Sequence, residues 1–184
     1  MSTIESSILV RPIWKIDLNH TATIVTSTPE AKRIAIASEA SIISVAEFGQ
    51  SSVQTINLSE PTRDLSINSA GNNLAVVGAS RKLQVLGFES SNFKREVARW
   101  ETPVYDTCTF SRDGDLLWTV GGLSDHVAEI HCYDARNWKL LDQLQFEPHI
   151  DGCGFILTLH PQDDLVGLWA CGGDRRSQTG RLRT

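Results

Sequence analysis

Residues 107–120 read TCTFSRDGDLLWTV, and the pattern of this stretch decides the fold class. Polar and apolar side chains alternate over 107–111, with Cys108 and Phe110 on one face, which is typical of a strand with one buried side. The Asp113-Gly114 pair predicts a tight turn, because glycine adopts positive φ at little cost. Residues 116–120 are apolar on both faces, which favours a strand enclosed between two sheets. The stretch therefore predicts a hairpin inside a stacked, all-β fold.

The same pattern recurs along the chain at offsets of 40, 43 and 49 residues. The second copy predicts strands at 64–67, 74–78, 83–88 and 96–100, and the third copy predicts them at 107–111, 116–120, 127–133 and 139–146. No segment longer than about ten residues has helical periodicity. Four short strands in roughly 43 residues is the spacing of a β-propeller blade.

The third copy carries the residues that point to a known family. Phe110-Ser111-Arg112-Asp113-Gly114, followed by Gly121-Gly122 and then Tyr133-Asp134, resembles a WD40 repeat or a YVTN-like repeat. Arginine stands where that family has proline, and tyrosine stands where it has tryptophan. A looser match begins at Leu159-His160-Pro161. The resemblance spans roughly residues 13–173 and implies a partial propeller of about three and a half four-stranded blades.

The repeat boundaries divide a single propeller-type domain covering residues 1–184. We expect an orphan outer strand at residues 13–20 and three full blades at 21–60, 61–102 and 103–151. An incomplete blade follows at 152–173, and an Arg-rich tail at 174–184. The tail lacks alternation, so we expect it to add no strand to the last blade.

An array of this length leaves an open sheet edge, because WD40 propellers usually close with about seven blades. Three explanations remain open at this point: a truncated reading frame, a half-propeller that pairs with a second chain, or closure with four blades. We rank them in that order.

Composition excludes several classes of protein. The net charge of −5 disfavours a nucleic-acid partner, which would need a basic stripe. The chain has no apolar run near the roughly 18 residues of a membrane helix, and no secretory signal is readable at its start. We therefore expect a cytoplasmic protein without nucleic-acid or membrane partners, in which Cys108, Cys132, Cys153 and Cys171 are unpaired thiols.

No motif points to catalysis, a metal or a cofactor. The cysteines lack the close pairing of a zinc site, and no nucleophile elbow, phosphate loop or dinucleotide fingerprint is present. Asp125, His126, His131 and Asp134 cluster in the third copy. The WD40 resemblance implies structural hydrogen bonds for such residues, so we expect a structural role for them.

The resemblance also implies where a working surface would lie. In propellers the connections leading into each first strand, and the turns between second and third strands, gather on one rim that commonly binds peptides. The candidate residues for this rim are Arg63, Arg81, Tyr105, Asp106, Asp125, His126 and Phe155. Arginine and tyrosine are enriched at interface hot spots.

The sequence favours a non-catalytic protein–protein interaction scaffold of the WD40 type that takes a protein or peptide partner. A homodimer that completes the propeller is part of this expectation. One alternative is an enzymatic propeller such as a lactonase-like hydrolase, which would need several acidic or histidine side chains at aligned positions in or just before the first strands, where only Asp106 is acidic. The other is a gene fragment without independent function. Fold alone does not separate these classes.

Overall fold

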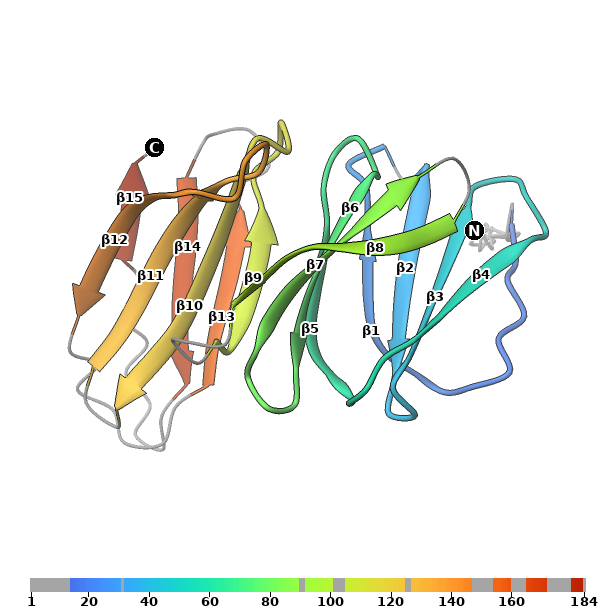
Figure 1. The fold of residues 1–184 in the computed structure, drawn as a ribbon, viewed down its shortest axis with the longest axis horizontal. Helices are drawn as coiled ribbons and strands as arrows, with labels where there is room; N and C mark the ends of the chain where they lie inside the picture. Colours follow the sequence, from blue (N-terminus) through green and yellow to red (C-terminus); the bar gives the residue numbers. More distant parts are fainter. Residues whose placement is uncertain are drawn as a thin grey trace, which may run out of the picture.

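The strands of this chain form four antiparallel sheets placed one after another (Figure 1). The computed structural model describes residues 14–30, 32–89, 92–100, 105–124, 127–146, 154–159, 165–171 and 180–183. Within these ranges every regular element is a β-strand, which confirms the all-β prediction, and none is a helix long and apolar enough to cross a membrane. We call each sheet a blade.

Each blade is a meander whose strands pair in chain order. Blade 1 contains β1 (Ala22–Ser27), β2 (Arg33–Ser38), β3 (Ile42–Glu47) and β4 (Val53–Asn57). Blade 2 contains β5 (Thr62–Ile67), β6 (Asn73–Gly78), β7 (Leu83–Glu89) and β8 (Asn92–Trp100). Blade 3 contains β9 (Thr107–Phe110), β10 (Leu116–Ser124), β11 (Val127–Asp134) and β12 (Leu140–Phe146). Blade 4 contains β13 (Gly154–Leu159), β14 (Leu165–Cys171) and β15 (Gly180–Arg183). The first strands β1, β5, β9 and β13 neighbour one another in space.

Turn chemistry explains why the first two strands form a hairpin in blades 1, 2 and 3. A polar side chain at the end of the first strand accepts a hydrogen bond from the backbone where the second strand begins. Thr28 accepts from Arg33 N at 3.2 Å, Asn68 accepts from Asn73 N at 3.0 Å, and Ser111 accepts from Leu116 N at 2.9 Å. These three positions are equivalent in the repeat, so the turn is encoded locally in each of these three copies.

The hydrophobic core lies between the blades. Alternate residues of β6 pack into two different core regions. Leu74 and Val76 pack toward blade 1, and Ala75 and Val77 pack toward blade 3. In β10, Leu117 packs toward blade 2, whereas its neighbour Trp118 joins the layer that contains Leu157 of blade 4. This confirms that the second strands of blades 2 and 3, β6 and β10, are enclosed on both faces.

The predicted strands of the second and third copies are confirmed with small differences at their ends. Two differences are larger. The strand predicted at 96–100 begins at Asn92 in β8, and in β10 the turn predicted from Gly121 onward is instead a continuation of the strand to Ser124. A β-bulge between Gly122 and Ser124 accommodates the glycines while the pairing with β11 continues.

Two expectations for the ends of the repeat array are wrong. Residues 14–20 form no strand, although their side chains alternate between half-buried and exposed. Trp14 instead packs edge-on against Phe48 at 5.4 Å, and its Nε1 donates to Gln50 O at 3.2 Å. At the other end, Gly180–Arg183 of the tail does form a strand, β15, which pairs antiparallel with Leu165–Leu168 of β14.

Candidate functional site

Arg63 lies at the predicted rim, in a β-bulge of the first strand of blade 2. The register between β5 and β6 shifts between Thr62 and Asp64, so Arg63 is the extra residue in the ladder. Thr23 has the same place in the bulge of blade 1. Because a bulge re-aims its extra residue away from the sheet, the Arg63 side chain is 45% exposed at this end of the blade.

Arg81 is fixed by its backbone in the turn between β6 and β7. Its φ is +65°, a left-handed conformation that is uncommon for a residue other than glycine. Arg81 N donates to Gly78 O at 2.9 Å, and Arg81 O accepts from Tyr105 N at 2.7 Å. The turn of blade 2 is thereby tied to the segment that leads into blade 3, and the Arg81 side chain is 36% exposed beside it.

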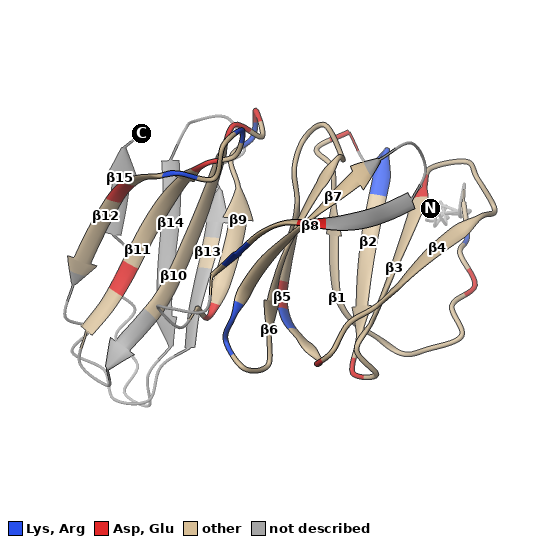
Figure 2. Cartoon of the chain, viewed as in Figure 1, with Lys and Arg blue, Asp and Glu red and all other residues tan. Residues whose placement is uncertain are grey.

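Asp106 joins both arginines. Its carboxylate is 3% exposed, and each oxygen has one guanidinium partner: Oδ1 lies 3.0 Å from Nη2 of Arg63, and Oδ2 lies 2.7 Å from Nη2 of Arg81. We call Arg63, Arg81 and Asp106 the charged rim. Acidic and basic segments meet at the lower ends of β5, β6 and β9 (Figure 2). The structure therefore brings together three of the seven residues that the sequence placed on one rim.

Of the other four predicted residues, Tyr105 is the one whose side chain the structure describes. Tyr105 is fully buried, which corrects its expected exposure on the rim: its hydroxyl lies 2.8 Å from the Tyr133 hydroxyl inside the core between blades 2 and 3. Burial raises the pKa of the Tyr105 phenol, with Tyr133 as a further cause, so the hydroxyl stays protonated. Phe155 lies in β13, but its side chain is outside the described residues, as are Asp125 and His126.

A cavity of about 520 Å³ opens beside the charged rim, between the first strands of the blades. Arg63 and Asp106 line it together with Asp64 and Cys108. Burial raises the pKa of the Cys108 thiol, and the Asp64 carboxyl adds to this, so the thiol is not a nucleophile at neutral pH. Cys108 and Cys132 are free and buried, as expected.

Asp64 is a residue that sequence reasoning missed. Its Oδ2 accepts hydrogen bonds from Thr107 Oγ1 and from Cys108 N, the latter at 2.8 Å, and its Oδ1 accepts from Leu65 N at 2.8 Å. Burial raises the pKa of the Asp64 carboxyl, while these hydrogen bonds and Arg63 oppose the rise. The sequence contained one indication of a special role for Asp64: blade 1 has an isoleucine at the equivalent repeat position.

Glu60 is a second missed residue of this end of the blade. It accepts hydrogen bonds from the backbone N and from the hydroxyl of Ser80, both at 2.6 Å. In the repeat it matches His20, whose Nε2 lies 2.8 Å from Ser44 Oγ. A polar side chain in front of the first strand thus braces the blade in both copies.

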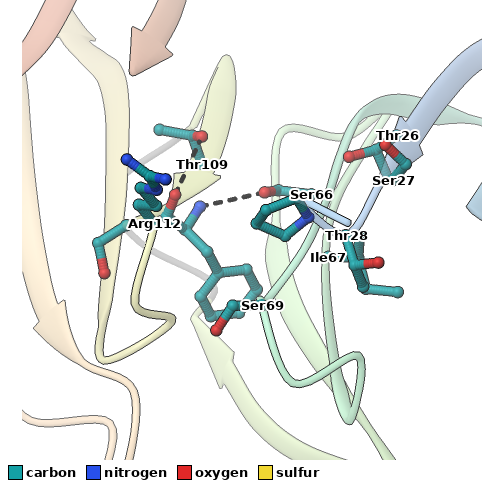
Figure 3. Close-up of a pocket in the computed structure, with 11 residues that line it drawn as sticks. Thr26, Ser27, Thr28, Ser66, Ile67, Ser69, Thr109 and Arg112 are labelled. Atoms are coloured by element: carbon teal, nitrogen blue, oxygen red, sulfur yellow. Dashed lines mark hydrogen bonds between the residues drawn. The ribbon is translucent and has the colours of Figure 1, made fainter. Parts of the chain in front are cut away.

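A second hollow, of about 410 Å³, lies at the opposite ends of the first strands. Hydroxyl side chains dominate its lining, and Arg112 borders it (Figure 3). Ser66 Oγ accepts from Phe110 N at 3.0 Å and so links the first strands of blades 2 and 3 there. The described residues contain no group of three His, Cys, Asp or Glu side chains suited to a metal ion.

Comparison with known proteins supports the fold and leaves the family open. A scan against protein families and a search of curated proteins both found no match. Among solved structures the chain is similar to U3-55K, a WD40 propeller protein, with a TM-score of 0.60 and 13% sequence identity.

That similarity covers 91% of this chain and 55% of the U3-55K chain. At this level of identity it shows the fold alone. The chain therefore has an all-β, WD40-like partial propeller fold, and it spans little more than half of the length of the propeller protein to which it is similar.

Proposed function

We propose that this chain is a non-catalytic interaction scaffold of the WD40 type, and that the charged rim is where a protein or peptide partner docks. The observation that supports this most is the pair of partly exposed arginines held on one buried carboxylate. Arginine is enriched at hot spots, and rigid presentation lowers the entropy lost on binding. The WD40-like fold of the structural neighbour is consistent with a scaffold.

The enzymatic alternative receives less support from the carboxylates beside the cavity. Both oxygens of Asp106 are held by arginines, and both oxygens of Asp64 accept hydrogen bonds from the strand edges. A general base or a metal ligand needs a carboxylate oxygen directed at the reacting group, whereas these oxygens are directed at the arginines and the strand edges. Stoichiometric divalent metal in the purified protein would contradict the scaffold proposal.

Selection from a displayed random-peptide library against the immobilised protein tests the proposal. We expect enriched peptides whose binding is weakened by Arg63→Gln and Arg81→Asn. Arg136→Asn is the matched control, because Arg136 forms an exposed ion pair with Asp115 at the opposite ends of the strands. If no peptide is enriched, or if binding depends on Arg136 and not on the charged rim, the proposal is wrong.

We further propose that the protein is cytoplasmic and that a second copy covers its open end at blade 4. In blade 3, Leu144 of β12 pairs with Ile130, which packs in the core facing blade 4, yet the Leu144 side chain is 45% exposed. In blades 1 and 2 the corresponding outer-strand residues Ile56 and Ala98 pack against the next core. Blade 4 has three described strands, and none is placed outside β15 to cover Leu144.

A further inference from the structure

We infer that the charged rim recognises an acidic side chain of a peptide partner, a carboxylate or a phosphate, held by the guanidinium groups of Arg63 and Arg81. This inference rests on the proposed docking function and adds the chemical class of the ligand. It depends on three features of the site: the arrangement of the arginines, their free donors, and the engagement of the nearby carboxylates.

The first feature is that the two arginines are held in place before any ligand arrives. Asp106 contacts one Nη2 of each side chain, so both guanidinium groups are directed to the same point. Their backbones are also fixed, Arg63 by the bulge in β5 and Arg81 by its left-handed turn and the hydrogen bond from Tyr105 N. Arginine loses little further freedom when it binds an anion from such a state.

The second feature is that most of the hydrogen-bonding capacity of the arginines is unused. A guanidinium group has five N–H donors. Within the described residues, Arg63 and Arg81 each use Nη2 toward Asp106. The Nε–H of Arg81 is buried without an acceptor, so it is not one of the donors open to a ligand. The two guanidinium groups carry one positive charge more than the Asp106 carboxylate that they share, although Asp64 also acts on Arg63. Planar N–H forks match carboxylate and phosphate oxygens.

The third feature concerns the negative groups that would oppose an anion. Asp106 is buried beneath the arginines, so its charge is already neutralised by direct contact. Asp64 lines the same cavity, but its two oxygens face the backbone of Leu65 and the Thr107–Cys108 edge. The exposed face of the charged rim therefore presents donors to an incoming ligand.

A single acidic side chain suits this site better than a nucleic acid. The chain carries a net charge of −5, and a nucleic acid needs several phosphate contacts along a basic surface. The charged rim offers two arginines at one place, which is the size of one carboxylate or one phosphate group. A peptide can bring that one group and use the adjoining cavity for its neighbouring residues.

The peptide selection described above also tests this inference. We expect the enriched sequences to share Asp or Glu at one position. The best sequence is then synthesised with a fluorescent label in three forms, with the acidic residue, with its amide, and with phosphoserine. We expect the amide form to bind at least about tenfold more weakly than the acidic form, because it loses a charge-assisted pair. Tighter binding of the phosphoserine form would identify phosphate as the preferred source of the anion.

Variants of the protein locate the effect. Arg63→Gln and Arg81→Asn are made singly, because the remaining arginine still pairs with Asp106 and protects the fold. Asn is chosen at position 81 because it tolerates positive φ. We expect each variant to reduce binding of the acidic peptide about tenfold, Arg63→Lys to reduce it less, and Arg136→Asn to leave it unchanged. A thermal melt of each variant checks that it is folded.

The outcomes separate this inference from the proposed function. If peptides are enriched and depend on the charged rim, but the amide form binds as well as the acidic form, the acidic class is wrong and the scaffold proposal stands. If no peptide is enriched, both fail. If a single-stranded RNA binds and displaces the acidic peptide at the charged rim, the site recognises a polyanion and the inference is overturned.

Discussion

Single residues with unusual backbone or burial show how tightly the blades fit together. Gly114 has φ +83°, and a Cβ at this position would lie 2.6 Å from Ser69 Oγ and 3.2 Å from Ser69 N of the neighbouring blade. Gly49 has a similar φ of +78° but open space around it. A comparison of substitutions at the two glycines therefore separates the cost of backbone strain from the cost of a clash between blades.

We expect Gly114→Ala to lower the free energy of unfolding more than Gly49→Ala does. The strain of positive φ costs both variants about 1–2 kcal/mol, and only Gly114→Ala must also displace Ser69, whose hydroxyl donates to Asp113 O at 2.6 Å. Urea unfolding curves of the two variants measure the difference. Equal losses would mean that the turns of blades 2 and 3 do not touch as described.

The buried tyrosines allow a double-mutant test at the same scale. The Tyr133 hydroxyl lies 2.8 Å from that of Tyr105 and 3.3 Å from His131 Nδ1. Tyr133→Phe leaves the buried Tyr105 hydroxyl without a partner, so we expect a loss of about 1–3 kcal/mol. The double variant Tyr105→Phe, Tyr133→Phe removes both hydroxyls and should cost less than the sum of the single variants. Strict additivity in chemical denaturation would contradict the pair.

At the scale of the strand, β11 places Glu129, His131 and Tyr133 on one face, all buried. His131 Nε2 lies 3.2 Å from Glu129 Oε2, and Gln143 donates to Glu129 Oε1 at 2.8 Å. Burial lowers the pKa of the His131 imidazole below its ordinary value of 6.5, and Glu129 only partly opposes this. The strand therefore holds a neutral histidine in the core between blades.

This lowered pKa predicts a loss of stability in acid. The unfolded chain takes up a proton near pH 6.5 and the folded chain does so only at lower pH, so the free energy of unfolding falls as pH drops below about 6.5. The slope from one group is at most about 1.4 kcal/mol per pH unit. Urea unfolding between about pH 7.5 and pH 5.5 measures it. We expect His131→Gln to flatten this dependence, and an unchanged slope in His131→Gln would refute the assignment.

The strands were predictable because their signals are local. Alternation and the polar residues at Thr28, Asn68 and Ser111 recur in the first three copies, so the repeat shows them several times, and the third copy adds an Asp-Gly turn. β15 was missed because four residues contain little periodicity, and their pairing with β14 depends on contacts across the sheet. For residues 14–20 the error is the opposite one, because a strand was predicted and none forms. Alternating burial shows only that one side of the segment is covered, and it does not require hydrogen bonding to a neighbouring strand.

The charged rim was predictable only in part. Repeat alignment places Arg63, Arg81 and Asp106 at one end of the blades, but alignment does not show that the two arginines share one carboxylate. Tyr105 reads as a loop residue because it lies between predicted strands, and its burial comes from Tyr133 of another strand. Pairing and burial are tertiary properties that a strand pattern does not contain.

At the scale of the whole molecule, the exposed apolar side chains of β12 bear on association. Leu140, Leu141 and Leu144 are all exposed, and β15 forms the edge of the described part of blade 4. An open edge beside apolar side chains favours pairing with another chain. The described residues form four sheets, so two copies together would supply roughly eight blades.

We expect light scattering after size exclusion to give a discrete species of about twice 20.3 kDa, the mass of two chains. Leu144→Glu should shift this species to a single chain, because a carboxylate would have to be buried in the interface. Val97→Glu is the matched control, since Val97 is also exposed, at 39%, but lies on the outer strand of the complete blade 2. A wild-type monomer would mean that the open end needs no second copy. Heterogeneous aggregate would mean that a second copy does not cover it, and either result would leave the charged rim to be tested separately by the peptide selection.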